Sequence, residues 1–386
     1  MGKNILVAHG GGPTAVINTS LQGVIEAARQ SGQVDKIYAA RFGAEGLLGD
    51  DLIDLTEVPA QVISLLSQTP ATAIGSCRRK IGDADYPALM ACFKKYDIDC
   101  FFYNGGNDSM DTCYKISLMA EKEGLDLCVI GIPKTMDNDL VLTDHCPGFG
   151  SAARFGAINA TELSLDAAGL PIHVVVLELM GRNAGWVTAS AALARLWSKT
   201  PQLVYLPEAP VDTDKMLADI ETEFAKGRGL LVTVSEGIRN AEGKMLSDTG
   251  IVDGFGHTVP GGTAQTVSDM IMEKLGIKSR AEKPGLLGRT SVAYASSIDR
   301  QEAYAVGKFA VAQALAGKTG AMVAIDAVRS PVYTYALSLV PLSQVANVEK
   351  TFPTAWIEDG NRISDDFFDY CLPLIGGDLP EYAHLQ

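Results

Sequence analysis

Residue types suited to phosphoryl transfer gather in one short stretch, Pro133–Asp139, which reads P-K-T-M-D-N-D. In an extended backbone, Thr135, Asp137 and Asp139 would project to the same side because they alternate along the chain. Lys134 offers a cation for the transferred group, one carboxylate can act as a general base, and another can help to hold a metal ion. A solvated turn rich in Asp and Asn is the alternative interpretation.

Two glycine-rich turns offer backbone N–H groups to a phosphate. Gly10–Thr14 (G-G-G-P-T) follows an apolar run and precedes a helical pattern, so that glycines and free helical N–H groups could meet an anion there. In Asn104–Asp111 two glycines precede Asn107, Asp108 and Ser109, whose oxygen atoms suit Mg²⁺. A tight turn and helix capping by Asp108 or Ser109 are the alternatives.

Three more loops place charged residues after apolar runs. Met180–Arg182 reads M-G-R, Ser235–Gly237 reads S-E-G, and Gly75–Lys80 ends in three adjacent cations on an acidic chain. A surface salt bridge is the alternative for each single arginine. The placement of all these loops at the ends of predicted strands favours a binding role.

The elements that position these loops alternate between apolar runs of strand length and stretches with helical spacing. The predicted strands are Asn4–Ala8, Lys36–Ala40, Cys100–Tyr103, Cys128–Ile132, Val174–Leu177, Leu203–Leu206, Leu230–Ser235 and Ala321–Ile325. The predicted helices are Thr14–Gln30, Tyr86–Tyr96, Met110–Glu123, Ala152–Ala168 and Asp214–Lys226. Such alternation predicts an α/β fold with mostly parallel sheets flanked by helices, and ligands at the carboxyl ends of the strands. Val252–Gly262 is predicted to be a loop.

Composition excludes several classes of protein. A net charge of −14 over 386 residues argues against nucleic acid or an anionic membrane as a partner. No apolar run approaches the roughly 18 residues that span a bilayer, and the amino terminus lacks a secretory pattern. Seven cysteines without a CxxC pair and five histidines without HxxxH or HExxH disfavour a zinc site. We therefore expect a cytoplasmic protein with reduced thiols.

Five motifs in register resemble the 6-phosphofructokinase family, and the resemblance extends from Gly10 to about Lys308. The motifs are GGxxxxxN (Gly11–Asn18), GGxDS (Gly105–Ser109), PKTxDND (Pro133–Asp139), MGR (Met180–Arg182) and SEG (Ser235–Gly237). The family's fold implies two similar α/β lobes, each a mostly parallel sheet flanked by helices, with the active site in the cleft between them. We expect a donor-phosphate lobe at 1–147, completed by segments around 285–330, a sugar-phosphate lobe at 148–284, and a C-terminal segment, 331–386, that packs on both.

The resemblance also implies roles for single residues. Asp137 matches the base that deprotonates the C1 hydroxyl of the sugar, and Lys134, Asp108 and Arg182 complete the catalytic set. Asn107 and Asp137 are the implied metal ligands, for Mg²⁺. The implied diphosphate contacts are Gly11, Arg78 and Lys134. The implied sugar-phosphate contacts are Thr135, Asp139, Met180, Gly181, Arg182, Glu236, Arg280 and Arg289. In the family the counterpart of Arg280 comes from a neighbouring subunit, which implies a homo-oligomer, a dimer or a tetramer.

Several positions depart from the ATP-dependent bacterial members of the family. Asp108 and Lys134 stand where those members carry glycines, and this pair is similar to that of the pyrophosphate-dependent branch. A carboxylate at Asp108 disfavours a nucleotide's α-phosphate by bulk and repulsion, while Lys134 attracts the distal phosphoryl group. The other departures are Asn107 for a metal-binding Asp, Leu286 for a His and His173 for an Arg near the sugar phosphate, and Gln22 and Glu26 for two arginines that bind allosteric effectors.

The sequence therefore predicts reversible, Mg²⁺-assisted phosphoryl transfer from diphosphate to O1 of fructose 6-phosphate, a step of glycolysis and gluconeogenesis. An ATP-dependent 6-phosphofructokinase is one alternative, and a diphosphate-dependent kinase that also accepts sedoheptulose 7-phosphate is another. A catalytically silent sugar-phosphate-binding subunit is the alternative from a different class. The joint presence of Lys134, Asp137, Asp139 and Arg182 argues against such a silent subunit.

Overall fold

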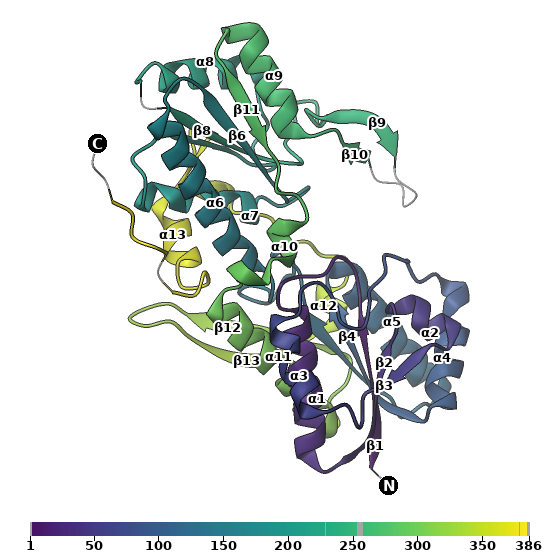
Figure 1. Ribbon diagram of the computed structural model, residues 1–386. Coiled ribbons are helices and arrows are strands. Elements are labelled where there is room, and N and C mark those ends of the chain that lie inside the picture. Colours follow the sequence, from purple (N-terminus) through teal and green to yellow (C-terminus); the bar gives the residue numbers. More distant parts are fainter. Residues whose placement is uncertain (1, 228, 253–257, 378, 384–386) are drawn as a thin grey trace. The chain divides into compact units, whose positions relative to one another are not determined.

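The chain forms two α/β units in a computed structural model (Figure 1). The structure describes residues 2–227, 229–252, 258–377 and 379–383. Unit 1 comprises Met1–Ser151 and Arg289–Lys350, and unit 2 comprises Ala152–Gly288 and Thr351–Gln386. The stretch 331–386, predicted as one C-terminal segment, is thus divided between the units. Residues 334–341 belong to unit 1 because they pair with its sheet as an added antiparallel strand.

Unit 1 is built on a seven-stranded sheet in the order β13-β12-β5-β4-β1-β2-β3. Its strands are β1 (Lys3–His9), β2 (Val34–Ala40), β3 (Leu52–Asp54), β4 (Ile98–Gly105), β5 (Cys128–Pro133), β12 (Ala321–Val328) and β13 (Thr334–Pro341). Only the edge strands β3 and β13 pair antiparallel with their neighbours. Along β1, Ile5 and Val7 belong to the core on one face, and Leu6 and Ala8 to the core on the other. Burial of both faces explains the unbroken apolar run.

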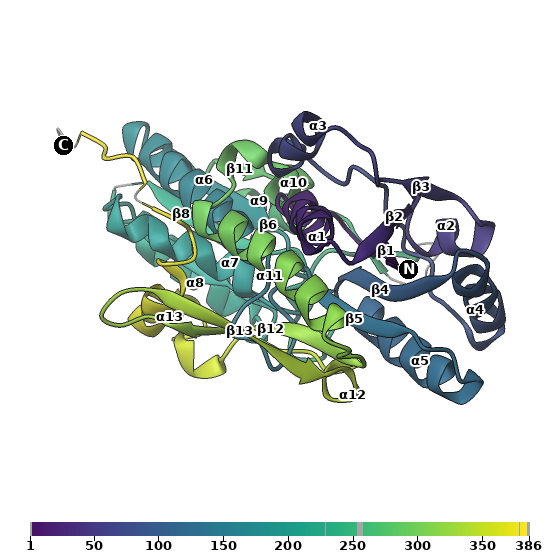
Figure 2. The same cartoon turned by 90° about the horizontal axis from the view of Figure 1, so that it is seen from below.

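Helices cover both faces of this sheet. Those lying wholly in unit 1 are α1 (Ile17–Ser31), α2 (Ala44–Gly49), α3 (Ala60–Ser64), α4 (Tyr86–Lys95), α5 (Asn107–Glu123), α11 (Ser297–Leu315) and α12 (Leu342–Val345). α1 and α11 lie side by side on one face, and α4 and α5 pack on the other (Figure 2). A Cβ at Gly23 would overlap the carbonyl of Tyr304, and one at Gly307 that of Ser20. These glycines therefore let the two helices approach closely.

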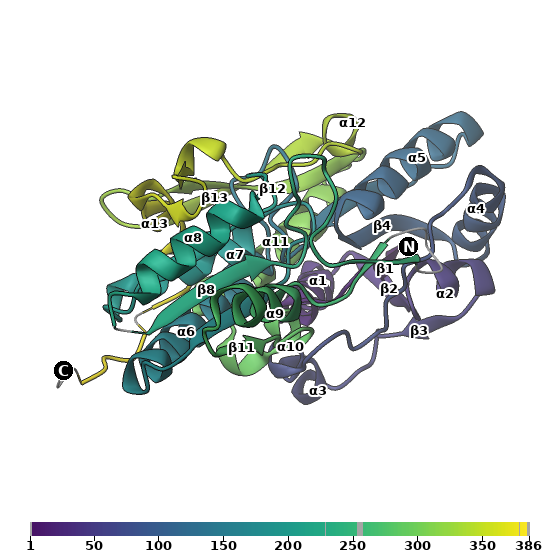
Figure 3. The same ribbon diagram turned by 90° about the horizontal axis from the view of Figure 1, so that it is seen from above.

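Unit 2 contains a four-stranded, wholly parallel sheet in the order β11-β6-β8-β7. The strands of this sheet are β6 (Val174–Leu179), β7 (Gln202–Tyr205), β8 (Leu230–Ser235) and β11 (Ser279–Glu282). Two separate antiparallel pairs are β9 (Asp248–Val252) with β10 (Thr258–Pro260), and β14 (Ile357–Glu358) with β15 (Arg362–Ile363). Its other helices are α7 (Trp186–Ala189), α8 (Thr213–Phe224), α9 (Thr263–Leu275) and α13 (Asp365–Cys371), while α6 (Phe149–Gly169) and α10 (Leu287–Thr290) contain the unit boundaries. α8 and α9 build its apolar core with the sheet (Figure 3).

All eight predicted strands occur, and so do the five predicted helices; Leu230–Ser235 has the bounds of β8, and the other elements differ at one end or both. The helix predicted from Thr14 begins at Ile17, and the helix predicted from Met110 begins at Asn107. Prediction of a loop throughout Val252–Gly262 is wrong because Thr258–Pro260 forms β10, while residues 253–257 lie outside the described residues. Within the described ranges, no helix is long and apolar enough to cross a membrane.

Candidate functional site

Three of the predicted loops lie together at one edge of the unit 1 sheet. β1, β4 and β5 are parallel neighbours, so their carboxyl ends meet at that edge. The Gly10 amide donates to the Asn104 carbonyl over 2.9 Å, and the Lys134 amide donates to the Gly105 carbonyl over 3.1 Å. The backbone thus ties each loop to its neighbour.

Lys134 carries a buried ammonium group into the centre of these loops. Its Nζ donates to the Gly12 carbonyl over 2.7 Å, and 3% of the residue is exposed. Burial lowers the pKa of Lys134 to about 8; the charges of Asp137 and Asp139 oppose the shift, while Arg289 adds to it. The group is therefore still mostly cationic at neutral pH and is held ready for an anion.

The glycines of these loops make room for polar neighbours. A Cβ at Gly10 or at Gly105 would overlap the Ser109 Oγ, and Gly11 has a φ of 73°, which favours glycine. A Cβ at Gly12 would overlap the guanidinium of Arg289, which therefore lies directly against this loop. Arg289 thus adds a second cation beside Lys134.

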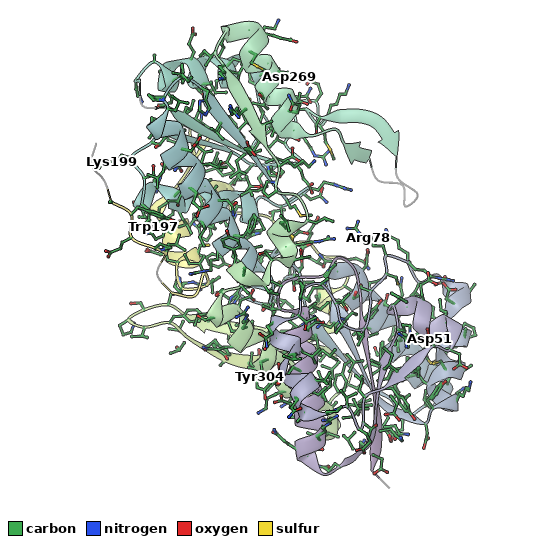
Figure 4. The ribbon with its side chains drawn as sticks, viewed as in Figure 1. Asp51, Arg78, Trp197, Lys199, Asp269 and Tyr304 are labelled. Atoms are coloured by element: carbon green, nitrogen blue, oxygen red, sulfur yellow. The ribbon has the colours of Figure 1, made fainter. Side chains whose placement is uncertain are left out.

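The loop that contains Arg78 runs beside the glycine turn. The Gly11 amide donates to the Cys77 carbonyl over 3.0 Å, and the Ser76 hydroxyl donates to the Gly11 carbonyl over 2.6 Å. Arg78 is exposed (Figure 4), and its charge contributes to lowering the pKa of Lys134. Arg79 instead pairs with Glu45 and Asp85, so the salt-bridge alternative holds for that arginine.

Strand β5 ends at Pro133, and the stretch that follows it to Asp139 turns, so the extended backbone considered for Thr135, Asp137 and Asp139 is not what the structure has. Asn138 has a φ of 56°, and the Thr135 hydroxyl accepts a hydrogen bond from the Asp137 amide over 3.1 Å, which together make a turn. The Asn138 side chain stabilises the turn, because its Oδ1 accepts the Cys146 amide over 3.0 Å. Asn tolerates a left-handed backbone better than most residues, so the motif suits a turn.

Two oxygens of this edge suit a metal ion. The Asn107 Nδ2 donates to the Asp139 Oδ2 over 3.0 Å, while the Asn107 Oδ1 and the Asp139 Oδ1 are buried without a hydrogen-bond partner among the described residues. The described chain contains no group of three or more His, Cys, Asp or Glu side chains that could hold a metal. The two oxygens of Asn107 and Asp139 fit Mg²⁺, because this ion uses few protein oxygens together with water and substrate phosphate.

Asp108 lies in the first turn of α5 and is exposed. The N-cap of this helix is Gly106, and no side chain caps it. Helix capping by Asp108 or Ser109 is therefore not what the structure has. A carboxylate in the first helical turn still gains from the helix dipole.

Unit 2 holds the M-G-R and S-E-G loops, which follow the adjacent strands β6 and β8. The Ser235 hydroxyl donates to the Gly181 carbonyl, and the Glu236 amide donates to the Leu179 carbonyl over 3.1 Å. A Cβ at Gly237 would overlap the backbone of Arg182. The two loops are therefore in direct backbone contact.

A cavity of about 210 Å³ in unit 2 opens beside these loops. It is lined by Glu178, Leu179, Met180, Glu236, Lys283, Gly285 and Leu286. Burial raises the pKa of Glu236, while the Gly181 amide and the charge of Arg182 oppose the shift. The Lys283 ammonium lies 2.8 Å from the buried Glu178 carboxylate.

Sequence reasoning missed Glu178 and Lys283. The available signal was a carboxylate inside the otherwise apolar strand V-V-V-L-E-L, because a buried charge in a strand needs a partner. Of the two arginines at the end of the list of implied sugar-phosphate contacts, Arg280 is exposed on β11 in unit 2, while Arg289 lies in unit 1. His173 is buried immediately before β6.

Comparisons with known proteins agree with the motifs. Residues 4–314 match the family described as Phosphofructokinase. A pyrophosphate–fructose 6-phosphate 1-phosphotransferase of Halomonas elongata is 42% identical over 99% of this chain and 94% of its own length, and that of Methylococcus capsulatus is also 42% identical with the same coverage. The crystal structure of a pyrophosphate-dependent phosphofructokinase from Nitrosospira multiformis superimposes with a TM-score of 0.90 at 41% identity, covering 100% of this chain and 95% of that one.

Proposed function

The chain belongs to the phosphofructokinase family, and from this premise we propose that it transfers a phosphoryl group from diphosphate to O1 of fructose 6-phosphate. The products are fructose 1,6-bisphosphate and phosphate, and the reaction runs in both directions. The names of relatives that cover nearly the whole chain support this donor and this acceptor.

The observation that carries the proposal is the buried ammonium of Lys134. It donates to the Gly12 carbonyl in the turn that also contacts Arg289, in a chain whose net charge is −14. Two cations concentrated on a glycine turn suit a small, highly charged anion, because charge attraction is much stronger away from water. Diphosphate is such an anion.

Asp108 supports diphosphate over ATP. Its carboxylate is exposed in the first turn of α5. There, by resemblance to the diphosphate branch, it faces the position of a nucleotide's α-phosphate. Like-charge repulsion and bulk then exclude ATP while leaving room for a donor that ends at its second phosphate.

The chemistry assigned to the loop follows from its residue types. Asp137 accepts the proton of the C1 hydroxyl, O1 forms a bond to the distal phosphorus, and the bridging P–O bond breaks to release phosphate. Lys134 stabilises the negative charge of the transferring group. Glu236 and Met180–Arg182 bind the sugar phosphate.

Mg²⁺ is the proposed metal. The unpartnered oxygens of Asn107 and Asp139 fit it, and Asp137 is the further ligand that the resemblance implies. When bound, the ion neutralises phosphate charge.

We further propose a homo-oligomer, in which the exposed Arg280 of one copy reaches the sugar phosphate of another. Its compartment is the cytoplasm, which is supported by seven cysteines that are all free thiols.

A direct assay tests the proposed function. The rate of fructose 1,6-bisphosphate formation is measured with diphosphate and with ATP at equal fructose 6-phosphate and Mg²⁺. We expect diphosphate to be far the better donor, and Asp137→Asn to lower kcat on the order of 10²–10⁴-fold while the protein stays folded. A wild-type preference for ATP would overturn the donor, and an Asp137→Asn variant of normal activity would overturn the base.

A further inference from the structure

The turn that contains Lys134, Asp137 and Asp139 is held by the chain that returns after it. The Thr135 amide donates to the Pro147 carbonyl over 3.2 Å, and Thr135 forms a parallel bridge with Gly148. The Asn138 Oδ1 accepts the amide of Cys146 over 3.0 Å. The place of the turn therefore depends on residues 143–148, which we call the return segment.

Two buried carboxylates of α11 hold the return segment. Asp299 accepts the Gly148 amide over 2.8 Å and the Ser151 amide over 2.9 Å. Glu302 is three residues further on and so lies on the same side of the helix. Both residues are 1% exposed, so their charges are compensated by protein groups.

His145 joins the return segment to that helix. Its Nδ1 lies 2.9 Å from Asp144 and its Nε2 lies 2.7 Å from Glu302. Two further groups complete the cluster, since Arg329 donates to both oxygens of Asp144 and the Tyr333 hydroxyl donates to Glu302. His145 is itself 1% exposed, so the cluster is inside unit 1.

We propose that His145 is a positioning residue: as an imidazolium between Asp144 and Glu302, it fixes the return segment and thereby the turn that carries Lys134, Asp137 and Asp139. The link between this cluster and catalysis rests on the proposed function of that turn. The role of His145 in fixing the return segment rests only on the contacts within unit 1.

The charges around His145 favour its protonated form. Burial alone would lower its pKa, but Glu302 and Asp144 outweigh burial and raise the pKa to about 9. Three other charged groups lie close to Asp144 and Glu302. Arg329 pairs with the Asp144 carboxylate and Lys350 donates to the Asp144 carbonyl, while Asp299 is the neighbour of Glu302 on α11. Because the pKa is raised on folding, the ion pairs contribute fully below about pH 6.5 and are lost as pH rises through about 9.

The test uses two readouts, because Lys134 also titrates in the alkaline range. Amide hydrogen exchange reports protection factors of residues 135–148 without any substrate, and steady-state kinetics reports kcat and KM with diphosphate. The variants are His145→Gln and Glu302→Gln, with the milder Tyr333→Phe in case either fails to fold. Ile37→Val is the control, since Ile37 is buried in β2, which β4 and β1 separate from β5.

At about pH 7 we expect His145→Gln and Glu302→Gln to lower the protection factors of 135–148 about tenfold. We expect kcat to fall on the order of 10–100-fold with the KM for diphosphate within about threefold, as for a misplaced catalytic group. Raising the pH to about 10 should lower wild-type protection in 135–148 and leave that of His145→Gln unchanged. Ile37→Val should lower thermal stability without lowering the protection factors of 135–148 or kcat.

Wild-type protection and wild-type kcat in His145→Gln would overturn the inference. The inference would also be overturned if Ile37→Val lowered the protection factors of 135–148 as much as His145→Gln does. Loss of protection in residues 135–148 of His145→Gln, in a protein whose wild type lacks diphosphate-dependent activity, would overturn the proposed function and leave the positioning role of His145 supported.

Discussion

Asp108 and Lys134 are the two residues on which the choice of donor depends. Asp108→Gly removes the charge and bulk that face an α-phosphate, so ATP should gain as a donor while diphosphate loses little or moderately. Lys134→Gly removes a buried cation, so the activity with diphosphate should collapse. The loss of transition-state stabilisation should be roughly 2–4 kcal/mol. The measurement is kcat/KM for both donors in the wild type, in each variant and in the double variant.

The two changes act on the same bound phosphates and should therefore be non-additive. A ratio of ATP to diphosphate activity that Asp108→Gly leaves unchanged would contradict the role of Asp108. Loss of stability alone would show that Asp108 serves α5 through the helix dipole, since Gly106 is the N-cap.

Single residues also show how far sequence alone could predict the site. Lys134 and Asp139 were predicted because their types and spacing fit phosphoryl transfer, and the structure brings them to one sheet edge. The contact of Arg289 with Gly12 was not predictable, because only the fold brings together residues so far apart in the chain. Glu178 was missed because the predicted strand ended at Leu177, while β6 continues to Leu179 and buries this carboxylate.

At the scale of elements, buried parallel strands were the most predictable part of the fold. β4, β5 and β8 carry runs of apolar residues that only a strand covered on both faces needs, and all three were predicted. β11 was missed, because S-R-A-E is short and polar and is a strand only through its pairing with β6. A turn in Pro133–Asp139 was the alternative interpretation, but the sequence did not show what holds it, since the Asn138 side chain accepts a hydrogen bond from the distant Cys146 amide.

Close packing between the loops after β6 and β8 gives a prediction at the same scale. Gly237→Ala would push a Cβ into the Arg182 backbone, so we expect a loss of roughly 1–3 kcal/mol of stability and a raised KM for fructose 6-phosphate. Thermal unfolding and sugar saturation curves measure the two effects. Gly49→Ala is the matched control, because a Cβ there meets nothing within 4 Å. An unchanged KM in Gly237→Ala would argue against a role of this contact in sugar binding.

For the molecule as a whole, the distribution of charge matters more than its sum. The net charge of −14 repels anions in general, so an anion site needs cations close to it, and the edge of unit 1 supplies Lys134, Arg289 and Arg78 beside the carboxylates of Asp137 and Asp139. Unit 1 is also discontinuous in sequence, because 289–350 completes it. That arrangement lets α11, from the second segment, hold a turn of the first.

We expect α1 to lack a binding site for anionic effectors. By resemblance, Gln22 and Glu26 replace the two arginines that bind effectors in allosteric bacterial members. The Gln22 amide donates to Glu26 over 2.9 Å, and the hydroxyl of Tyr304, which Figure 4 labels on α11, donates to the same carboxylate. A carboxylate held in this way repels phosphate and offers it no donor. We therefore expect fructose 6-phosphate saturation curves that neither ADP nor phosphoenolpyruvate changes. A sigmoidal curve that ADP makes hyperbolic would contradict this, and repeating the curve with Glu26→Gln would show whether the carboxylate itself takes part.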